Sequence, residues 1–142
     1  MLDHTPKKIF DKDGKLLWGH NGEGDYCDAK LCNADLAGAN LEGAIMMCVD
    51  LRHADLQGAD LYWVMLCNAD LEAADLRGAS LRGANLEKTN LRYAKLQGAD
   101  LGRDNLDGLT IIDGAIFDFA EYDKQTIFPE GFDPVAAGMI ET

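Results

Sequence analysis

The residue types that commonly carry chemistry are present in this chain, but they do not gather into a recognisable site. The three histidines among its 142 residues are scattered, at His4, His20 and His53. No HExxH sequence, zinc-ligand spacing, phosphate loop or nucleophile–base pair is present. Carboxylates are abundant, but without a predicted pocket they lack the desolvation that perturbs a pKa. We therefore expect a protein that is not an enzyme and that holds no metal and no cofactor.

Two further candidates for binding sites have simpler interpretations. The four cysteines lack a C-x-x-C spacing, so we expect free thiols. The run Asp-Lys-Asp-Gly at 11–14 is similar to part of a calcium loop, but Ile9 and His20 occupy the places of its first and last ligands. An Asp-Gly pair between two short apolar runs is instead typical of a β-hairpin, which we expect over residues 7–18.

The charge balance and the hydropathy pattern limit the partners. Twenty-five acidic and thirteen basic residues give a net charge of −12, which argues against direct binding to nucleic acid. No apolar run is long enough to cross a membrane, and the first residues do not have the pattern of a secretory signal. We expect a cytoplasmic protein with no membrane partner.

An apolar residue, almost always leucine, recurs at every fifth position over most of the chain, and an alanine usually stands two places before it. The apolar positions are Leu31, Leu36, Leu41, Met46, Leu51, Leu56, Leu61, Leu66, Leu71, Leu76, Leu81, Leu86, Leu91, Leu96, Leu101, Leu106 and Ile111. On a helix this spacing would wind around the rod, and on a strand it would alternate between faces. The pattern indicates a solenoid that turns a corner once per repeat and directs every leucine inward.

The repeat resembles that of the pentapeptide-repeat family over roughly residues 26–127. It reads Ala-Asp-Leu-Gln-Gly at 54–58, Ala-Asp-Leu-Tyr-Trp at 59–63 and Ala-Asn-Leu-Glu-Lys at 84–88. The resemblance implies an all-β fold, a right-handed, four-sided parallel β-helix with twenty residues per coil. In each repeat the central Leu fills the interior, and the Ala at the small position leaves it room. The Asp or Asn at the polar position binds turn amides, and Gly at the last position suits a positive φ.

We expect one domain over residues 1–142. Residues 1–25 form an N-terminal cap with the hairpin, residues 26–127 form the repeats, and residues 128–142 form a C-terminal cap. Asp133, Pro134 and Gly138 have the order of an N-cap, a first turn and a terminator, which predicts a short helix. Near 112–114 we expect a one-residue slip of phase, after which Phe117 and Tyr122 take the central position.

Residues twenty apart should stack in columns on the outside of the solenoid. One column alternates in charge and predicts a ladder of ion pairs between coils: Arg52, Glu72 and Arg92. A second carries a run of aspartates: Asp35, Asp55, Asp75 and Lys95. We interpret both columns as structural.

The polar pattern of the outward positions breaks in two neighbouring coils. We define the apolar patch as Ile45, Met47, Cys48, Tyr62, Trp63, Met65 and Cys67. Soluble monomers rarely expose such a patch, and Trp, Tyr and Met are favoured in interfaces. Either a protein partner or a second copy covers it, or the hairpin or tail of the same chain folds over it.

Two functional hypotheses follow. The first is a non-enzymatic interaction module that presents the apolar patch to a protein partner or to itself. The alternative comes from the resemblance, because some pentapeptide-repeat proteins mimic DNA, bind type II topoisomerases such as gyrase and confer fluoroquinolone resistance. Those relatives favour Phe at the central position and form long rods, whereas this coil of about five turns is roughly 24 Å long. Four arginines also interrupt the acidic surface: Arg52, Arg77, Arg82 and Arg92.

Overall fold

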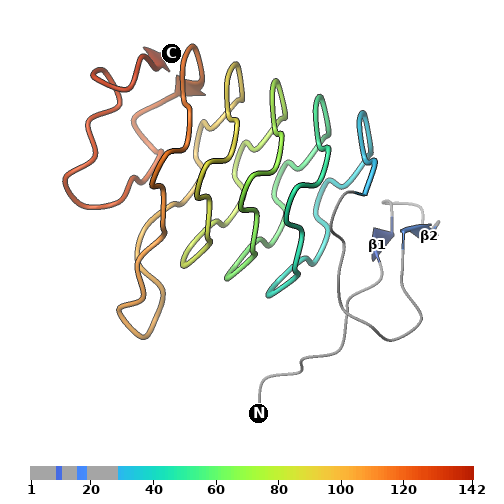
Figure 1. Ribbon diagram of the computed structural model, residues 1–142. Helices are drawn as coiled ribbons and strands as arrows, with labels where there is room; N and C mark the ends of the chain where they lie inside the picture. The colour runs from blue at the N-terminus through green and yellow to red at the C-terminus, as the bar shows by residue number, and fades with distance from the viewer. Residues whose placement is uncertain (1–8, 11–15, 19–28) are drawn as a thin grey trace.

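The fold is a stack of backbone coils, seen side by side in Figure 1. A computed structural model describes residues 9–10, 16–18 and 29–142 of the chain. Parallel bridges join residues twenty apart, beginning with Lys30 to Asp50 and continuing to Ser80 with Asp100. Since a bridge occurs at every fifth residue, each twenty-residue coil has four sides, as the resemblance implied.

Each repeat ends in a tight turn that explains its residue pattern. The Ala34 amide donates to the Leu31 carbonyl at 3.0 Å, and the same bond recurs in the later repeats. The third residue of each turn has a positive φ, for example 64° at Gly58, as a type II turn requires. Asp55 at the polar position accepts a hydrogen bond from the Gln57 amide at 3.1 Å. The roles predicted for the polar and last positions are therefore confirmed in this repeat.

The interior is a column of leucines surrounded by the small residues that stand two places before them. From Leu36 to Leu101, every residue at the central position is at most 1% exposed. Burying each such side chain contributes about 1.5–3 kcal/mol. Thr89 replaces alanine at one small position, and its buried hydroxyl donates to the Leu66 carbonyl at 2.7 Å. The substitution is tolerated because the hydroxyl has an acceptor.

The coil is interrupted earlier than the sequence indicated. The bridge spacing rises from 20 residues, between Ser80 and Asp100, to 26 residues, between Asn85 and Ile111. The extra residues form a loop over 102–110, hereafter the insertion loop, which protrudes from the solenoid in Figure 1. The predicted slip at 112–114 was therefore wrong in position, and Leu106 lies in the loop with 78% exposure. The predicted re-phasing is correct, because Phe117 and Tyr122 are buried, at 4% and 8% exposure.

The C-terminal segment adds one more strand pair and an aromatic cluster. Strand β3 (Glu121–Tyr122) pairs in parallel with β4 (Ile140–Glu141). Between them, Phe128 and Phe132 lie with ring centroids 5.0 Å apart and pack against the core.

The predicted C-terminal helix is absent from the described residues. Asp133 binds the amides of Val135 and Ala136 as an N-cap would, at 3.0 and 3.2 Å. One turn follows, closed by the Ala137 amide on the Asp133 carbonyl at 3.1 Å, and Gly138 then adopts a φ of 81°. The prediction was wrong because the terminating glycine comes after a single turn, too soon for a helix to continue.

The predicted N-terminal hairpin is present. Strand β1 (Ile9–Phe10) pairs antiparallel with β2 (Leu16–Trp18). Its role as a cap stays a prediction, since residues 1–8, 11–15 and 19–28 lie outside the described residues. Within the described part of the chain, no helix has the length and apolar character needed to span a membrane.

Candidate functional site

The centre of the apolar patch is a pair of stacked side chains at the polar position. Ile45 and Met65 are joined by a parallel bridge, and each is 37% exposed. The same column continues through Asn85 to Ile111, which is 41% exposed. The structure therefore places two adjacent exposed apolar side chains where other repeats carry a polar residue, and Asn85 separates them from Ile111.

The two described cysteines of the patch differ in exposure. The Cys48 amide donates to the Cys67 carbonyl at 3.0 Å, so the residues lie on adjacent coils. Cys48 is exposed, whereas Cys67 is only 8% exposed, and burial raises the pKa of the Cys67 thiol. Both thiols are free, as is that of Cys32, while Cys27 lies outside the described residues. Cys67 is thus a packing residue more than part of an accessible surface.

The insertion loop covers the aromatic end of the patch. The Trp63 indole Nε1 donates a hydrogen bond to Oδ2 of Asp104 in this loop. The backbone amide of Asn105 donates to the Tyr62 hydroxyl at 3.2 Å, and both aromatic side chains are half-buried. Their ring centroids lie 4.6 Å apart. Within the described residues, the segment that covers Tyr62 and Trp63 is therefore an internal loop. The sequence had suggested the hairpin or the tail for this role.

Asp104 holds the insertion loop in shape. Its Oδ1 accepts hydrogen bonds from the amides of Leu106 and Gly108 at 2.8 and 2.6 Å. The Trp63 N–H, with these amides, holds the pKa of the Asp104 carboxyl below its ordinary value. Glycine is required at two places, because a Cβ at Gly83 would overlap the Trp63 ring and one at Gly108 would overlap the Asp104 carboxylate. The aromatic end of the patch and its cover are thus built together.

A second exposed apolar surface lies nearer the C-terminal end of the solenoid, beyond Asn85. Leu109, at the end of the insertion loop, is 56% exposed and lies two residues before Ile111. A hollow of about 360 Å³ follows, between residues 109–113 and 129–132. The sequence did not indicate this second surface, because it depends on where the insertion loop ends.

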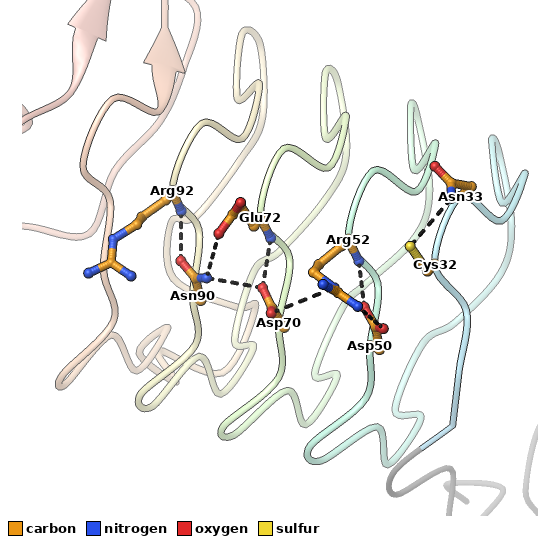
Figure 2. A network of polar contacts seen from close by, with 8 residues as sticks. All are labelled: Cys32, Asn33, Asp50, Arg52, Asp70, Glu72, Asn90 and Arg92. Carbon is orange, nitrogen blue, oxygen red and sulfur yellow. Dashed lines mark hydrogen bonds and ion pairs between the residues drawn. The ribbon is translucent and has the colours of Figure 1, made fainter.

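A polar network occupies another face of the solenoid, shown in Figure 2. Arg52 pairs with Asp50 on its own coil at 2.9 Å, and its hydrogen bonds hold the pKa of Asp50 below its ordinary value. Glu72 accepts a bond from the Asn90 side chain at 3.4 Å. Arg92 lies 3.8 Å from a carboxylate oxygen of Asp118 in the next coil. The predicted column is in register and continues to Asp118, which stacks on Arg92. Arg92 therefore pairs along the column, whereas Arg52 pairs with the neighbouring column that holds Asp50.

This network is structural in character. Its arginine side chains are nearly half exposed, so each ion pair contributes at most about 1 kcal/mol. Among the described residues, no group of three or more His, Cys, Asp or Glu side chains is placed to hold a metal ion.

Comparison with known proteins agrees with this geometry. The family of pentapeptide repeats matches residues 28–62 and 69–103, in eight copies. The crystal structure of alr5209, a pentapeptide repeat protein from Nostoc Pcc 7120, is 33% identical, with a TM-score of 0.55. The match covers 80% of this chain and 84% of that one. The chain belongs to the pentapeptide-repeat family. Members of this family form right-handed quadrilateral β-helices and are generally non-enzymatic structural or interaction modules.

Two other pentapeptide-repeat structures are more distant. Rfr23, from the cyanobacterium Cyanothece 51142, is 31% identical, covers 60% of this chain and 64% of its own, and has a TM-score of 0.34. QnrB1, a plasmid-mediated fluoroquinolone resistance protein, is 16% identical over 84% of each chain, with a TM-score of 0.33. Neither likeness bears on the function of this pentapeptide-repeat protein. No curated protein gives a match.

Proposed function

We propose that this pentapeptide-repeat protein is a non-catalytic interaction module whose binding surface is centred on Ile45 and Met65. The observation that supports it is the residue type at the polar position of these two repeats. Elsewhere, side chains such as that of Asp55 bind the turn amide two residues on, at 3.1 Å. Ile45 and Met65 cannot make that bond, and each still exposes 37% of its surface.

The exchange of a polar residue for an apolar one is unfavourable for the chain alone. A lost side-chain hydrogen bond costs about 1 kcal/mol, and the apolar side chain gains only part of its burial energy. When a second protein surface covers both side chains, their burial energy exceeds the cost of the lost hydrogen bonds, and the exchange becomes favourable. Exposed Cys48, three residues after Ile45, borders this surface and enlarges it. The covering surface belongs to another protein or to a second copy of the chain.

The experiment replaces both residues with one that the column already accepts. Asn85 lies next to Met65 in the column. An asparagine fits this position, because the side-chain oxygen of Asn85 accepts a hydrogen bond from the Glu87 amide at 3.0 Å. Ile45→Asn with Met65→Asn should therefore preserve the fold while removing the apolar surface. A matched control carries Asp55→Asn on another side of the coil.

Sedimentation velocity reports self-association, and affinity capture from host lysate followed by mass spectrometry reports other partners. We expect the double variant to lose a dimer or a captured protein that the wild type and the control retain. An identical oligomeric state and an identical set of captured proteins in all three would refute the proposal. Thermal unfolding measured by circular dichroism checks that the fold is intact.

The proposal includes a cytoplasmic location and no direct binding to nucleic acid or membranes. The net charge of −12 supports the second point, because phosphate groups repel an acidic surface.

The alternative is an acidic DNA mimic that binds a type II topoisomerase. It is supported by the register of Asp35, Asp55 and Asp75, which parallel bridges align on successive coils. Against it, Arg77 pairs with Asp75 at 2.7 Å and neutralises part of this column. A supercoiling assay with purified gyrase tests it directly. Unchanged gyrase activity at a large molar excess of the protein would exclude the alternative.

A further inference from the structure

Tyr93 and Phe119 form an exposed aromatic pair at one corner of the solenoid. Their ring centroids lie 5.2 Å apart with 13° between the planes, and the residues are 54% and 53% exposed. Both occupy the last position of their repeats, with φ of 60° and 61°, where bulky residues are strained. The rings therefore stack on each other, yet about half of each remains in water.

On the side of Tyr93 away from Phe119, the corner column carries a small residue, Ala73, and we call the space above its methyl group the slot. The Ala73 amide donates to the carbonyl of Arg92, and the His53 amide donates to the carbonyl of Glu72. These bonds place Tyr93, Ala73 and His53 at the same corner of successive coils. Coils are about 4.8 Å apart, so His53 and Tyr93 are separated by about 9.6 Å with only a methyl group between them. A planar group stacks at about 3.5–4.0 Å from the side chain on each side of it. One such group therefore fits between His53 and Tyr93, above Ala73.

A carboxylate side chain lies on the face of the solenoid that leads into this corner. Glu72 directly precedes Ala73, and Figure 2 shows it between Arg52 and Arg92 in its column. Both arginines are engaged elsewhere, Arg52 with Asp50 and Arg92 with Asp118. The ion pairs within the described residues do not include Glu72, whose bond to the Asn90 side chain is 3.4 Å long. Its negative charge is available to a cation.

We infer that this slot binds an arginine side chain of a basic protein partner. A guanidinium is planar and cationic, so it can stack on the open face of Tyr93 while it donates two hydrogen bonds to the Glu72 carboxylate. A lysine ammonium lacks the planar fork and stacks less well. The net charge of −12 favours a basic segment as the carrier of the arginine.

This site is distinct from the surface around Ile45 and Met65. Ala73 follows Trp63 by ten residues, which is two sides of the four-sided coil, so the two corners are diagonally opposite. Failure of one proposal therefore leaves the other unaffected.

The test uses the full chain and two blocked peptides of sequence Gly-X-Gly-X-Gly, with X either arginine or lysine. Aromatic carbon–proton correlation spectra follow Tyr93 and Phe119 during titration. We expect the arginine peptide to shift these signals and to bind at least about threefold more tightly than the lysine peptide. Glu72→Gln should weaken arginine-peptide binding by about five- to tenfold. Glu87→Gln, the equivalent position at another corner, should leave it unchanged.

A second variant blocks the slot without removing either interacting group. Ala73→Tyr places a third ring next to Tyr93, in a backbone conformation that Tyr93 itself adopts, and should abolish the arginine-specific shifts. Circular dichroism confirms folding. Equal binding of the two peptides, equal losses in Glu72→Gln and Glu87→Gln, or wild-type binding by Ala73→Tyr would each overturn the inference. Absence of any shift at Tyr93 would do the same.

Discussion

Replacing Leu71 with alanine tests whether the interior is as closely packed as the burial values indicate. Leu71 is fully buried, and the central residues of the adjacent coils, Leu51 and Leu91, are equally buried. The transfer of the lost methyl and methylene groups alone accounts for about 2 kcal/mol. Backbone hydrogen bonds from Leu71 to Asn90 and from Leu51 to Asp70 fix the coil spacing, so the cavity cannot collapse. We therefore expect Leu71→Ala to lower the free energy of unfolding by about 3–5 kcal/mol.

Leu106→Ala is the matched control, because the same atoms are removed from a residue with the same repeat phase. Leu106 is 78% exposed in the insertion loop, so we expect a change within about 0.5 kcal/mol. Urea denaturation followed by far-ultraviolet circular dichroism measures both variants. A loss below about 1 kcal/mol for Leu71→Ala, or similar losses for the two, would refute the packing argument.

The remaining predictions concern the turns and the insertion loop. Gly58→Ala should destabilise the protein by about 1 kcal/mol, because its φ of 64° is unfavourable for a residue with a Cβ. Nothing lies within 4 Å of the new Cβ, so no steric clash adds to this backbone strain. Ala73→Gly, where φ is 56°, should change stability in the opposite direction, and thermal unfolding measures both. The pKa of Asp104 is lowered in the folded state, so its contribution to stability is full above the unfolded pKa of about 3.9 and is lost as the pH falls through the folded value. Asp104→Asn should flatten the acid limb of the stability profile and shift Trp63 fluorescence to the red; an unchanged profile and spectrum would contradict the role given to this carboxylate.

The repeated coil could be predicted from the sequence because its rules are local. A small residue, a polar residue and a leucine specify one turn and one inward side chain, and stacking copies the result at each coil. The rule holds from Leu36 to Leu101 without an exposed central residue. The columns of residues twenty apart follow directly from it, including the juxtaposition of Ile45 and Met65.

The insertion loop was missed because spacing alone counted Leu106 and Ile111 as further repeats. The small position carried the relevant signal. Asp104 and Leu109 stand two places before Leu106 and Ile111, at what would be the small position. Neither side chain suits that position, because the four sides of the coil share one narrow interior. Thr110, two places before Ile112, fits it as Thr89 does in its own repeat, and its hydroxyl likewise donates to a backbone carbonyl, that of Leu81 at 3.1 Å. The side chain at the small position therefore indicates the register better than the leucine spacing does.

The covering of Trp63 was not predictable from local rules. Trp63 and Asp104 are 41 residues apart, and their hydrogen bond depends on the length of the insertion loop and on the missing side chains of Gly83 and Gly108. Glycine is common at the last position of the repeats, so Gly83 did not stand out in the sequence. The consequence for function is specific. Because the indole is already bonded to Asp104, a substitution of Trp63 would disturb the loop as well as the surface, whereas Ile45 and Met65 report on the surface alone.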